Sequence, residues 1–306
     1  MLVDGEAARA LGELARERWR RASSDAAPAP EPSDSDPWPA GVRPDIADTP
    51  VAIARTEPAW RGRPAVQEWK RLTLAAIATA RRTIYLENQY FTSPTMAEAL
   101  AKRLAEPEGP EIVLVSTEAS PSWFDRLSMD QARGVALRRL RAADVFGRFR
   151  AFCPETAHGQ PIIVHAKLCI TDDRLLRIGS ANLNNRSLGL DTECELAIEA
   201  EATPAAAAIE RLRDRLVGHY LNRSARDVAR AIARHGGLIA GIEALDRGRR
   251  LKQIEPPRMG PLGRLIAGYH LGDPLGAGDA WLPWRRRALL TAEVRAIAAG
   301  AQDGDV

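Results

Sequence analysis

Residues 162–196 of the chain read IIVHAKLCITDDRLLRIGSANLNNRSLGLDTECEL. Apolar, often β-branched residues from 162 to 170 predict a buried strand, and the alternation of side chains places His165 and Lys167 on one of its faces. The tetrapeptide at 171–174 predicts a turn, after which residues 175–180 return as a second strand. The stretch therefore predicts a hairpin that brings an imidazole and an ammonium group into the same space.

Polar side chains follow where these predicted strands end. Ser180 and Asn182 can present a hydroxyl and an amide as hydrogen-bond donors, and Lys167 adds a positive charge. His165 can act as a nucleophile or a proton-transfer group if an acceptor holds its second ring nitrogen. Glu193, at the start of the next apolar run, is the candidate for that acceptor. Together these groups suit a tetrahedral phosphate.

The spacing of these residues resembles the signature of the phospholipase D superfamily, a His-x-Lys-x4-Asp (HKD) motif followed by Gly-Ser-x-Asn. The matching positions are His165, Lys167, Asp172, Gly179, Ser180 and Asn182. Glu193 lies where the family places the carboxylate that orients the histidine. The resemblance implies that the catalytic residues are His165, Lys167, Asp172 and Glu193, with Lys167, Ser180 and Asn182 binding phosphate. We interpret Asp172 as structural, ordering the turn between the strands. The alternative is that His165 is a structural histidine whose hydrogen bonds are all made within the protein core.

A second resemblance lies upstream, at residues 83–91, TIYLENQYF. An apolar strand there becomes polar at Glu87, Asn88 and Gln89, which predicts that these side chains reach a pocket at the strand end. The alternative is an ordinary strand end with capping amides. The segment is similar to the one that opens the second half of lipid-acting phospholipases D. Both segments together resemble the C-terminal half of a two-motif bacterial phospholipase D.

The family's chemistry requires two histidines. One attacks phosphorus to form a phosphohistidine, and the other protonates the leaving alcohol and then activates water or an acceptor alcohol. This sequence contains one HKD motif, and by resemblance His165 would be the acid–base residue. The resemblance implies hydrolysis or transphosphatidylation of phospholipids at a site completed by a second copy, as in small one-motif nucleases of the superfamily, or by a separate N-terminal half. We expect no metal and no other cofactor, because Lys and His supply the charge.

Two other functions stay open. The chain is an inactive, truncated half of a phospholipase D if the helix predicted at 6–21 is the one that normally follows the family's first motif. It is a single-motif dimeric nuclease if the same chemistry acts on DNA. The balance of 43 basic and 40 acidic residues gives a net charge of only +3, which argues against nucleic acid as the partner.

Composition restricts the compartment. The 306 residues hold three cysteines in or beside predicted strands, which is typical of free thiols in a reducing environment. We expect no signal peptide and no membrane span, and hence a cytoplasmic location. Peripheral membrane contact is suggested by Trp281 and Trp284, followed by three arginines at 285–287. The alternative is aromatic packing beside a solvated Arg run.

Strands alternating with helices predict an α/β fold in which a mixed sheet is layered between helices, with a helical and irregular C-terminal extension. We expect three parts: an amphipathic helix and a Pro/Asp/Ser-rich linker at 1–50, a phospholipase D-like catalytic half-domain at 51–222, and a helical, Gly/Pro-rich extension at 223–306. Residues 254–283 are expected to have little regular structure. Strands are predicted at 51–55, 83–87, 111–116, 148–152 and 195–199, and helices at 64–80, 95–104 and 122–143.

Overall fold

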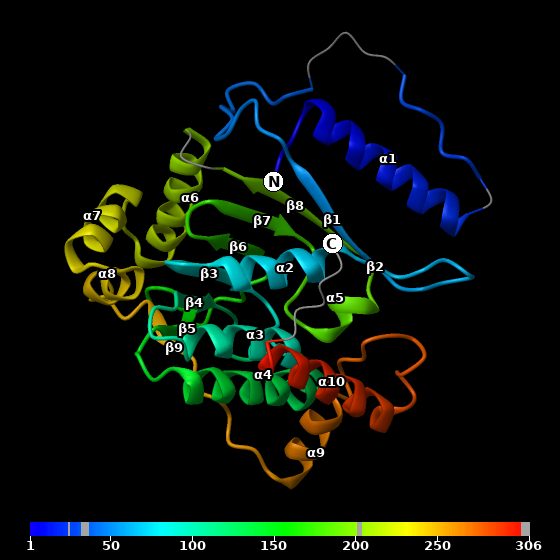
Figure 1. Ribbon diagram of the computed structural model, residues 1–306. Coiled ribbons are helices and arrows are strands. Elements are labelled where there is room, and N and C mark those ends of the chain that lie inside the picture. The colour runs from blue at the N-terminus through cyan, green and yellow to red at the C-terminus, as the bar shows by residue number, and fades with distance from the viewer. Residues whose placement is uncertain (24, 32–36, 201–203, 301–306) are drawn as a thin grey trace.

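The computed structural model describes residues 1–23, 25–31, 37–200 and 204–300 (Figure 1). Within these residues the centre is a mixed sheet of nine strands in the order β2-β1-β8-β7-β6-β3-β4-β5-β9. The strands are β1 Ala52–Glu57, β2 Val66–Gln67, β3 Thr83–Asn88, β4 Glu111–Val115, β5 Phe149–Pro154, β6 Lys167–Thr171, β7 Leu175–Gly179, β8 Glu193–Glu199 and β9 Leu251–Gln253. β3, β4 and β5 are parallel, and the other pairings are antiparallel.

Helices cover both faces of the sheet. The first face packs against α2 Glu68–Thr79, α3 Pro94–Leu104 and α4 Trp123–Ala143, and the second against α6 Pro204–Leu221, α7 Ala225–His235 and α8 Leu238–Leu245. The pleat of β3 shows why, since Ile84 and Leu86 join the first core and Tyr85 joins the second. The predicted α/β class with a mixed sheet between helices is confirmed.

The C-terminal part contains more regular structure than the sequence predicted. α9 Pro261–Tyr269 lies inside the segment expected to be irregular, so that expectation is wrong there. Pro261 occupies the first helical position, where a missing N–H costs nothing, so the residue taken as a helix breaker begins a helix. α10 Pro283–Ala298 also begins with proline, and α9 and α10 pack outside α3 and α4. β9 was not predicted, because its three residues become a strand only by pairing with β5.

Strand β6 begins at Lys167 rather than at Ile162, so His165 precedes it. Lys167 pairs with Asn88, the last residue of β3, and residues before Lys167 have no β3 partner left. The backbone there makes other bonds instead: the N–H of Ile162 donates to the carbonyl of Pro154 (2.8 Å). The apolar run therefore extends beyond the strand, and the expectation of a buried strand from 162 is wrong there: Val164 is buried, but Ile163 is 57% exposed.

The turn between β6 and β7 is fixed by its two aspartates. Asp172 and Asp173 have φ of 55° and 56°, the left-handed pair that a two-residue hairpin turn requires. The Asp172 carboxylate accepts backbone N–H groups from Arg81 (2.8 Å), Arg82 (2.7 Å) and Thr83 (2.9 Å). It thereby ties the hairpin to the start of β3, as its structural interpretation predicted.

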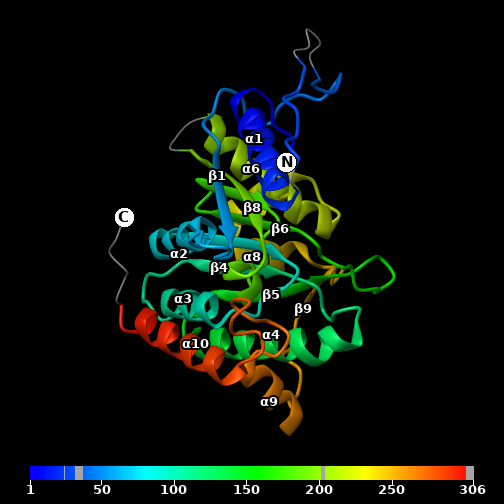
Figure 2. The same cartoon turned by 90° about the vertical axis from the view of Figure 1, so that its right-hand side faces the viewer.

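Helix α1, Gly5–Ala22, lies outside these layers beside β1 and β8 (Figure 2). None of its residues is fully buried. Arg18 donates to the carbonyl oxygen of Glu193 (2.8 Å), and Arg21 forms an ion pair with Glu57 on β1. α1 is therefore attached to the sheet largely by charged groups. Among the helices of the described residues, none is both long enough and apolar enough to cross a bilayer.

Replacing Asp172 with alanine is expected to lower the free energy of unfolding by about 2–3 kcal/mol, because three backbone donors lose a charged acceptor. Asp172→Asn keeps one acceptor oxygen and tolerates the left-handed backbone, so it should cost less. Urea unfolding of both variants measures the difference. Equal stability of the alanine variant and the wild type would contradict this role for the carboxylate.

Candidate active site

The predicted site residues gather at one edge of the sheet, where β3 and β7 end and β6 and β8 begin. The strand register places Asn88 beside Lys167 and Gly179 beside Glu195. We call this region, with its flanking residues 89, 165 and 180–193, the motif edge. Four strands thus bring together residues that are more than a hundred positions apart in sequence, such as Asn88 and Glu195.

Lys167 is the centre of one half of the motif edge. Its Nζ donates to Oε1 of Gln89 (3.0 Å) and to the carbonyl of His165 (2.8 Å), and lies 3.3 Å and 3.4 Å from the two ring nitrogens of His165. Burial lowers the pKa of Lys167, and the nearby carboxylates of Glu193 and Glu195 oppose that shift. His165 itself is exposed. A cation and an accessible imidazole therefore stand side by side.

Ser180 and Glu193 form the other half. The Ser180 hydroxyl donates to Glu193 and accepts the N–H of Cys194 (3.0 Å), while the hydroxyl of Ser187 donates to the second Glu193 oxygen (2.6 Å). Both oxygens of Glu193 are thus engaged by hydroxyl groups. Ser187 is placed by helix α5 (Asn185–Gly189), and no hydrogen bond joins Glu193 to His165 among the described residues, so the role of Glu193 toward the histidine stays a prediction.

Asn182 lies between these groups and keeps an uncommitted acceptor. Its backbone N–H donates to the hydroxyl of Ser187 (3.0 Å). Its side-chain Oδ1 is buried and has no hydrogen-bond partner within the described part of the chain. This oxygen can only accept a hydrogen bond, so a phosphate would have to be bound by the side-chain NH2 group of Asn182.

Gly179 is required by the close approach of β7 to β8. A Cβ atom at this position would lie 2.3 Å from the carbonyl oxygen of Cys194 and 2.5 Å from Oε1 of Glu195. Any side chain at Gly179 would therefore push β8 away. The glycine lets Ser180 and Glu193 come within hydrogen-bonding distance of each other.

The three polar residues at the end of β3 divide between the two faces of the sheet. Asn88 is buried at the motif edge, where its Oδ1 accepts the N–H of Leu183 (3.1 Å), and Gln89 contacts Lys167. Glu87 instead accepts hydroxyl groups from Tyr85 (2.6 Å) and from Tyr220 of α6 (3.0 Å). Burial raises the pKa of Glu87. The prediction of Glu87 as a pocket residue beside Asn88 and Gln89 is wrong, because strand alternation points it to the opposite face.

Glu195 was not predicted and lies at the motif edge. It is 3% exposed, its Oε1 accepts the N–H of Ala181 (2.9 Å), and burial raises its pKa to about 7, against the opposing influence of Arg177. The signal was present in the sequence, since Glu193 and Glu195 are two apart in a strand and so share a face. This face carries two carboxylates beside Lys167.

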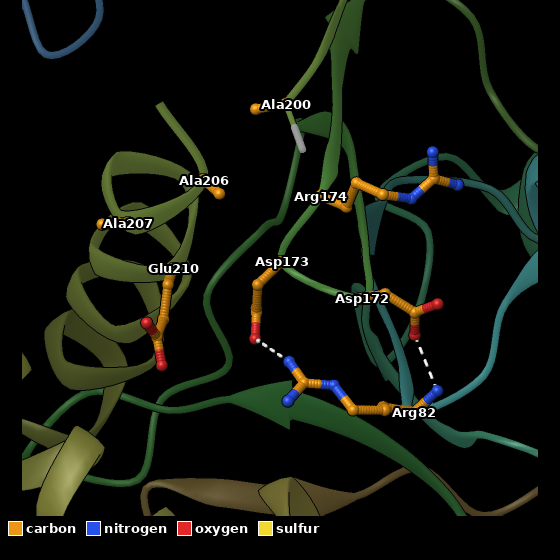
Figure 3. Close-up of a pocket in the computed structure, with 8 residues that line it drawn as sticks. All are labelled: Arg82, Asp172, Asp173, Arg174, Ala200, Ala206, Ala207 and Glu210. Atoms are coloured by element: carbon orange, nitrogen blue, oxygen red, sulfur yellow. Dashed lines mark hydrogen bonds and ion pairs between the residues drawn. The ribbon is translucent and has the colours of Figure 1, made fainter. Parts of the chain in front are cut away.

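A pocket of about 490 Å³ lies at the other end of the hairpin (Figure 3). It is lined by Arg82, Asp172, Asp173, Arg174, Ala200, Ala206, Ala207 and Glu210. None of these is a phosphate-binding residue of the motif. The figure shows the Asp172 carboxylate directed at the backbone of Arg82, whose N–H it accepts. This contact stabilises the fold.

Residues 73–216 match the family model described as cardiolipin synthase, PLD-like domain. The matched segment is a domain of the phospholipase D superfamily. The matched range contains every residue of the HKD and Gly-Ser-x-Asn motifs. The superfamily's members are phosphodiesterases, so the general activity of the fold is transfer or hydrolysis at a phosphodiester.

Three solved structures are similar to this phospholipase D-like chain. A phospholipase D family member, Nuc from Salmonella typhimurium, shares 19% identity over 55% of this chain and 95% of its own (TM-score 0.41). Phosphatidylserine synthase from Haemophilus influenzae Rd KW20 shares 15% over 64% of this chain and 47% of its own (TM-score 0.43). NucT from Helicobacter pylori shares 14% over 56% and 95% (TM-score 0.37). A search of curated proteins found no match.

Replacing Lys167 with alanine in this phospholipase D-like site is expected to lower kcat/KM on a phosphodiester by on the order of 10²-fold or more, because a preorganised charge is lost. Lys102→Ala, which removes an exposed lysine from α3, is the matched control and should leave kcat/KM unchanged. Steady-state kinetics of both variants test this. Equal loss in the two variants would mean that Lys167 has no special role.

Proposed function

We propose that the chain is a phospholipase D-type phosphodiesterase that acts on phospholipids, by hydrolysis or by transfer to an alcohol. Its site is completed by a second HKD motif, from a second copy or from a separate chain. The observation that carries the proposal is the exposed imidazole of His165 beside the half-buried ammonium of Lys167 at the motif edge. The match of residues 73–216 to a family model described as cardiolipin synthase supports a phospholipid substrate.

In the proposed reaction, one imidazole attacks phosphorus and the bond to the departing alcohol breaks. A second imidazole gives its proton to that alcohol. The second imidazole then takes a proton from water or from an acceptor alcohol, whose oxygen attacks the phosphohistidine and restores the free histidine. Lys167 and Asn182 would stabilise the charge on the phosphate oxygens, and Ser180 would add its hydroxyl after exchanging Glu193 for phosphate.

The need for a second motif follows from the surroundings of His165. Within the described residues, its ring nitrogens have Lys167 as their side-chain neighbour, and no second imidazole hydrogen-bonds with them. One histidine cannot be both bound to phosphorus and available to protonate the leaving group. A partner that supplies a second imidazole, facing the exposed side of His165, meets this requirement.

The test is the specific activity of the purified chain on phosphatidylglycerol and on a chromogenic phosphodiester, across a series of protein concentrations. If two copies form the site, activity per chain rises with concentration, and added His165→Ala protein lowers wild-type activity because mixed pairs hold one histidine. If a separate chain supplies the motif, the isolated protein is inactive and gains activity when that chain is added. Inactivity under all of these conditions contradicts the proposal.

A further inference from the structure

Large apolar side chains are exposed on α9, on the start of α10 and on the linker between them. They are Leu262, Leu265, Leu271, Trp281 and Trp284. The two tryptophans are 87% and 64% exposed and lie three positions apart, as do Leu262 and Leu265 on α9. Single exposed apolar residues are ordinary on a protein surface, but such a group on adjoining elements is typical of an interaction surface.

The charges exposed in the same part of the chain are all of one sign. Between residues 256 and 290 the exposed charged side chains are Arg258, Arg264, Arg285 and Arg287. The two acidic residues of this range, Asp273 and Asp279, are buried, and Asp279 lies 3.8 Å from the guanidinium of the buried Arg286. We call the five apolar residues and four arginines together the Trp–Arg surface. Its partner should therefore be both apolar and anionic.

Buried contacts hold the Trp–Arg surface in shape. The Arg286 guanidinium donates to the carbonyl of Tyr269 at the end of α9 (3.1 Å) and to those of Asp279 and Ala280 in the linker (3.0 Å and 2.9 Å). Arg287 lies over the ring of Tyr269, 5.2 Å from its centroid. The tryptophans and leucines are thus presented on a fixed support, so little ordering is needed on binding.

The linker between α9 and α10, residues 270–282, is also fixed beside the motif edge. The Asp273 carboxylate accepts the backbone N–H groups of Asn185 (3.0 Å) and Arg186 (2.9 Å), and the hydroxyl of Thr92 (2.8 Å). Asn185 and Arg186 begin α5, three residues after Asn182. Figure 1 shows α5 and the linker as neighbours on the same side of the molecule, the side that faces the viewer in Figure 2.

We propose that the Trp–Arg surface docks the chain on an anionic lipid bilayer and so holds the motif edge at the headgroup layer. Tryptophan and arginine suit this place, because Trp partitions to the interface and Arg is attracted to anionic headgroups. A second copy fits less well, since self-pairing would set arginine against arginine. The inference rests on the proposed function in one respect, that the bilayer holds the substrate.

Flotation of the full chain with vesicles tests the docking. At about 0.15 M salt the protein should float with phosphatidylcholine vesicles that contain phosphatidylglycerol, and much less with phosphatidylcholine alone. Arg285→Gln/Arg287→Gln should bind the anionic vesicles about 30-fold more weakly, since each arginine near the surface contributes roughly fivefold in affinity. Trp281→Ala/Trp284→Ala should lose at least about tenfold.

Three controls separate docking from other causes. Trp19→Ala removes an exposed tryptophan from α1, and Arg230→Gln/Arg234→Gln removes the same charge from the exposed face of α7, so both should float like the wild type. His165→Ala should also float like the wild type, so docking is measured even if the chain has no turnover.

The proposal is overturned by any of three results: flotation of the Trp281→Ala/Trp284→Ala variant at wild-type level, loss of binding in the α7 variant to the same extent, or absence of wild-type binding to anionic vesicles. It is also overturned if, without vesicles, the tryptophan variant changes the protein from a larger to a smaller species on a sizing column. That result would assign the surface to contacts between copies.

Discussion

Replacing His165 with alanine is expected to abolish phosphodiester turnover, with a loss on the order of 10⁴-fold or more. The variant keeps Lys167, the Ser180–Glu193 pair and the carbonyl oxygen of residue 165, to which Lys167 donates. The variant loses the imidazole, which either bonds to phosphorus or transfers a proton to the leaving alcohol. Initial rates on the chromogenic phosphodiester, measured against a protein-free blank, give the size of the loss.

The fold should survive this change. His165 is exposed, so its truncation should alter the free energy of unfolding by less than about 0.5 kcal/mol. His158→Ala is the matched control, because His158 is also an exposed histidine and lies in the preceding loop. It should keep wild-type activity. An active His165→Ala protein, or an inactive His158→Ala protein, would place the essential imidazole elsewhere.

The second large effect concerns stability against pH and comes from Glu195. Burial raises the pKa of this carboxyl from its ordinary 4.5 to about 7 in the folded protein. Between these two values the folded state binds more protons than the unfolded state, so stability falls as pH rises. The shift corresponds to a loss of about 3 kcal/mol in the free energy of unfolding. This loss is absent below pH 4.5 and complete above pH 7.

Glu195→Gln removes this titration and keeps an oxygen for the N–H of Ala181. The stability of the variant relative to the wild type should therefore increase by about 3 kcal/mol from pH 4.5 to pH 7. Urea unfolding at a series of pH values gives the difference curve. Using the difference removes contributions common to both proteins, such as that of buried Glu87.

Glu199→Gln is the control on the same strand, since Glu199 is exposed and its ion pair with Arg174 is on the surface. Its difference curve should be flat. If the curve for Glu195→Gln is equally flat, Glu195 does not titrate between pH 4.5 and pH 7. That result would contradict the statement that burial raises its pKa.

Sequence reasoning identified the hairpin and its motif well, for a physical reason. Strand alternation and turn chemistry are local, and the positions of His165, Lys167, Asp172, Gly179 and Ser180 depend on little else. The turn needed two residues with positive φ and found them in Asp172 and Asp173. Gly179 was recognised as part of a motif. The sequence did not show why a glycine is needed there, because β8, which it contacts, begins 14 residues further along the chain.

The features that sequence reasoning misplaced or missed depended on strand direction or on contacts between distant segments. Glu87 was grouped with Asn88 and Gln89 because the three are adjacent, although a strand points neighbours to opposite faces and Tyr220 of α6 holds Glu87 there. Nothing local reveals that Ser187 donates to Glu193, and the predicted role of Glu193 toward His165 stays a prediction. β9 has no pattern of its own and exists because β5 has a free edge.

The attachment of α1 has a consequence for the control of the motif edge. This helix buries none of its residues completely, and its bonds to the sheet come from Arg18 and Arg21, of which Arg18 reaches the main chain of Glu193 itself. Such contacts weaken as dissolved ions screen them, whereas the two apolar cores beneath do not. We therefore expect added salt to weaken the attachment of α1 before it affects the sheet, whereas the Glu193 carboxylate stays held by the hydroxyl groups of Ser180 and Ser187.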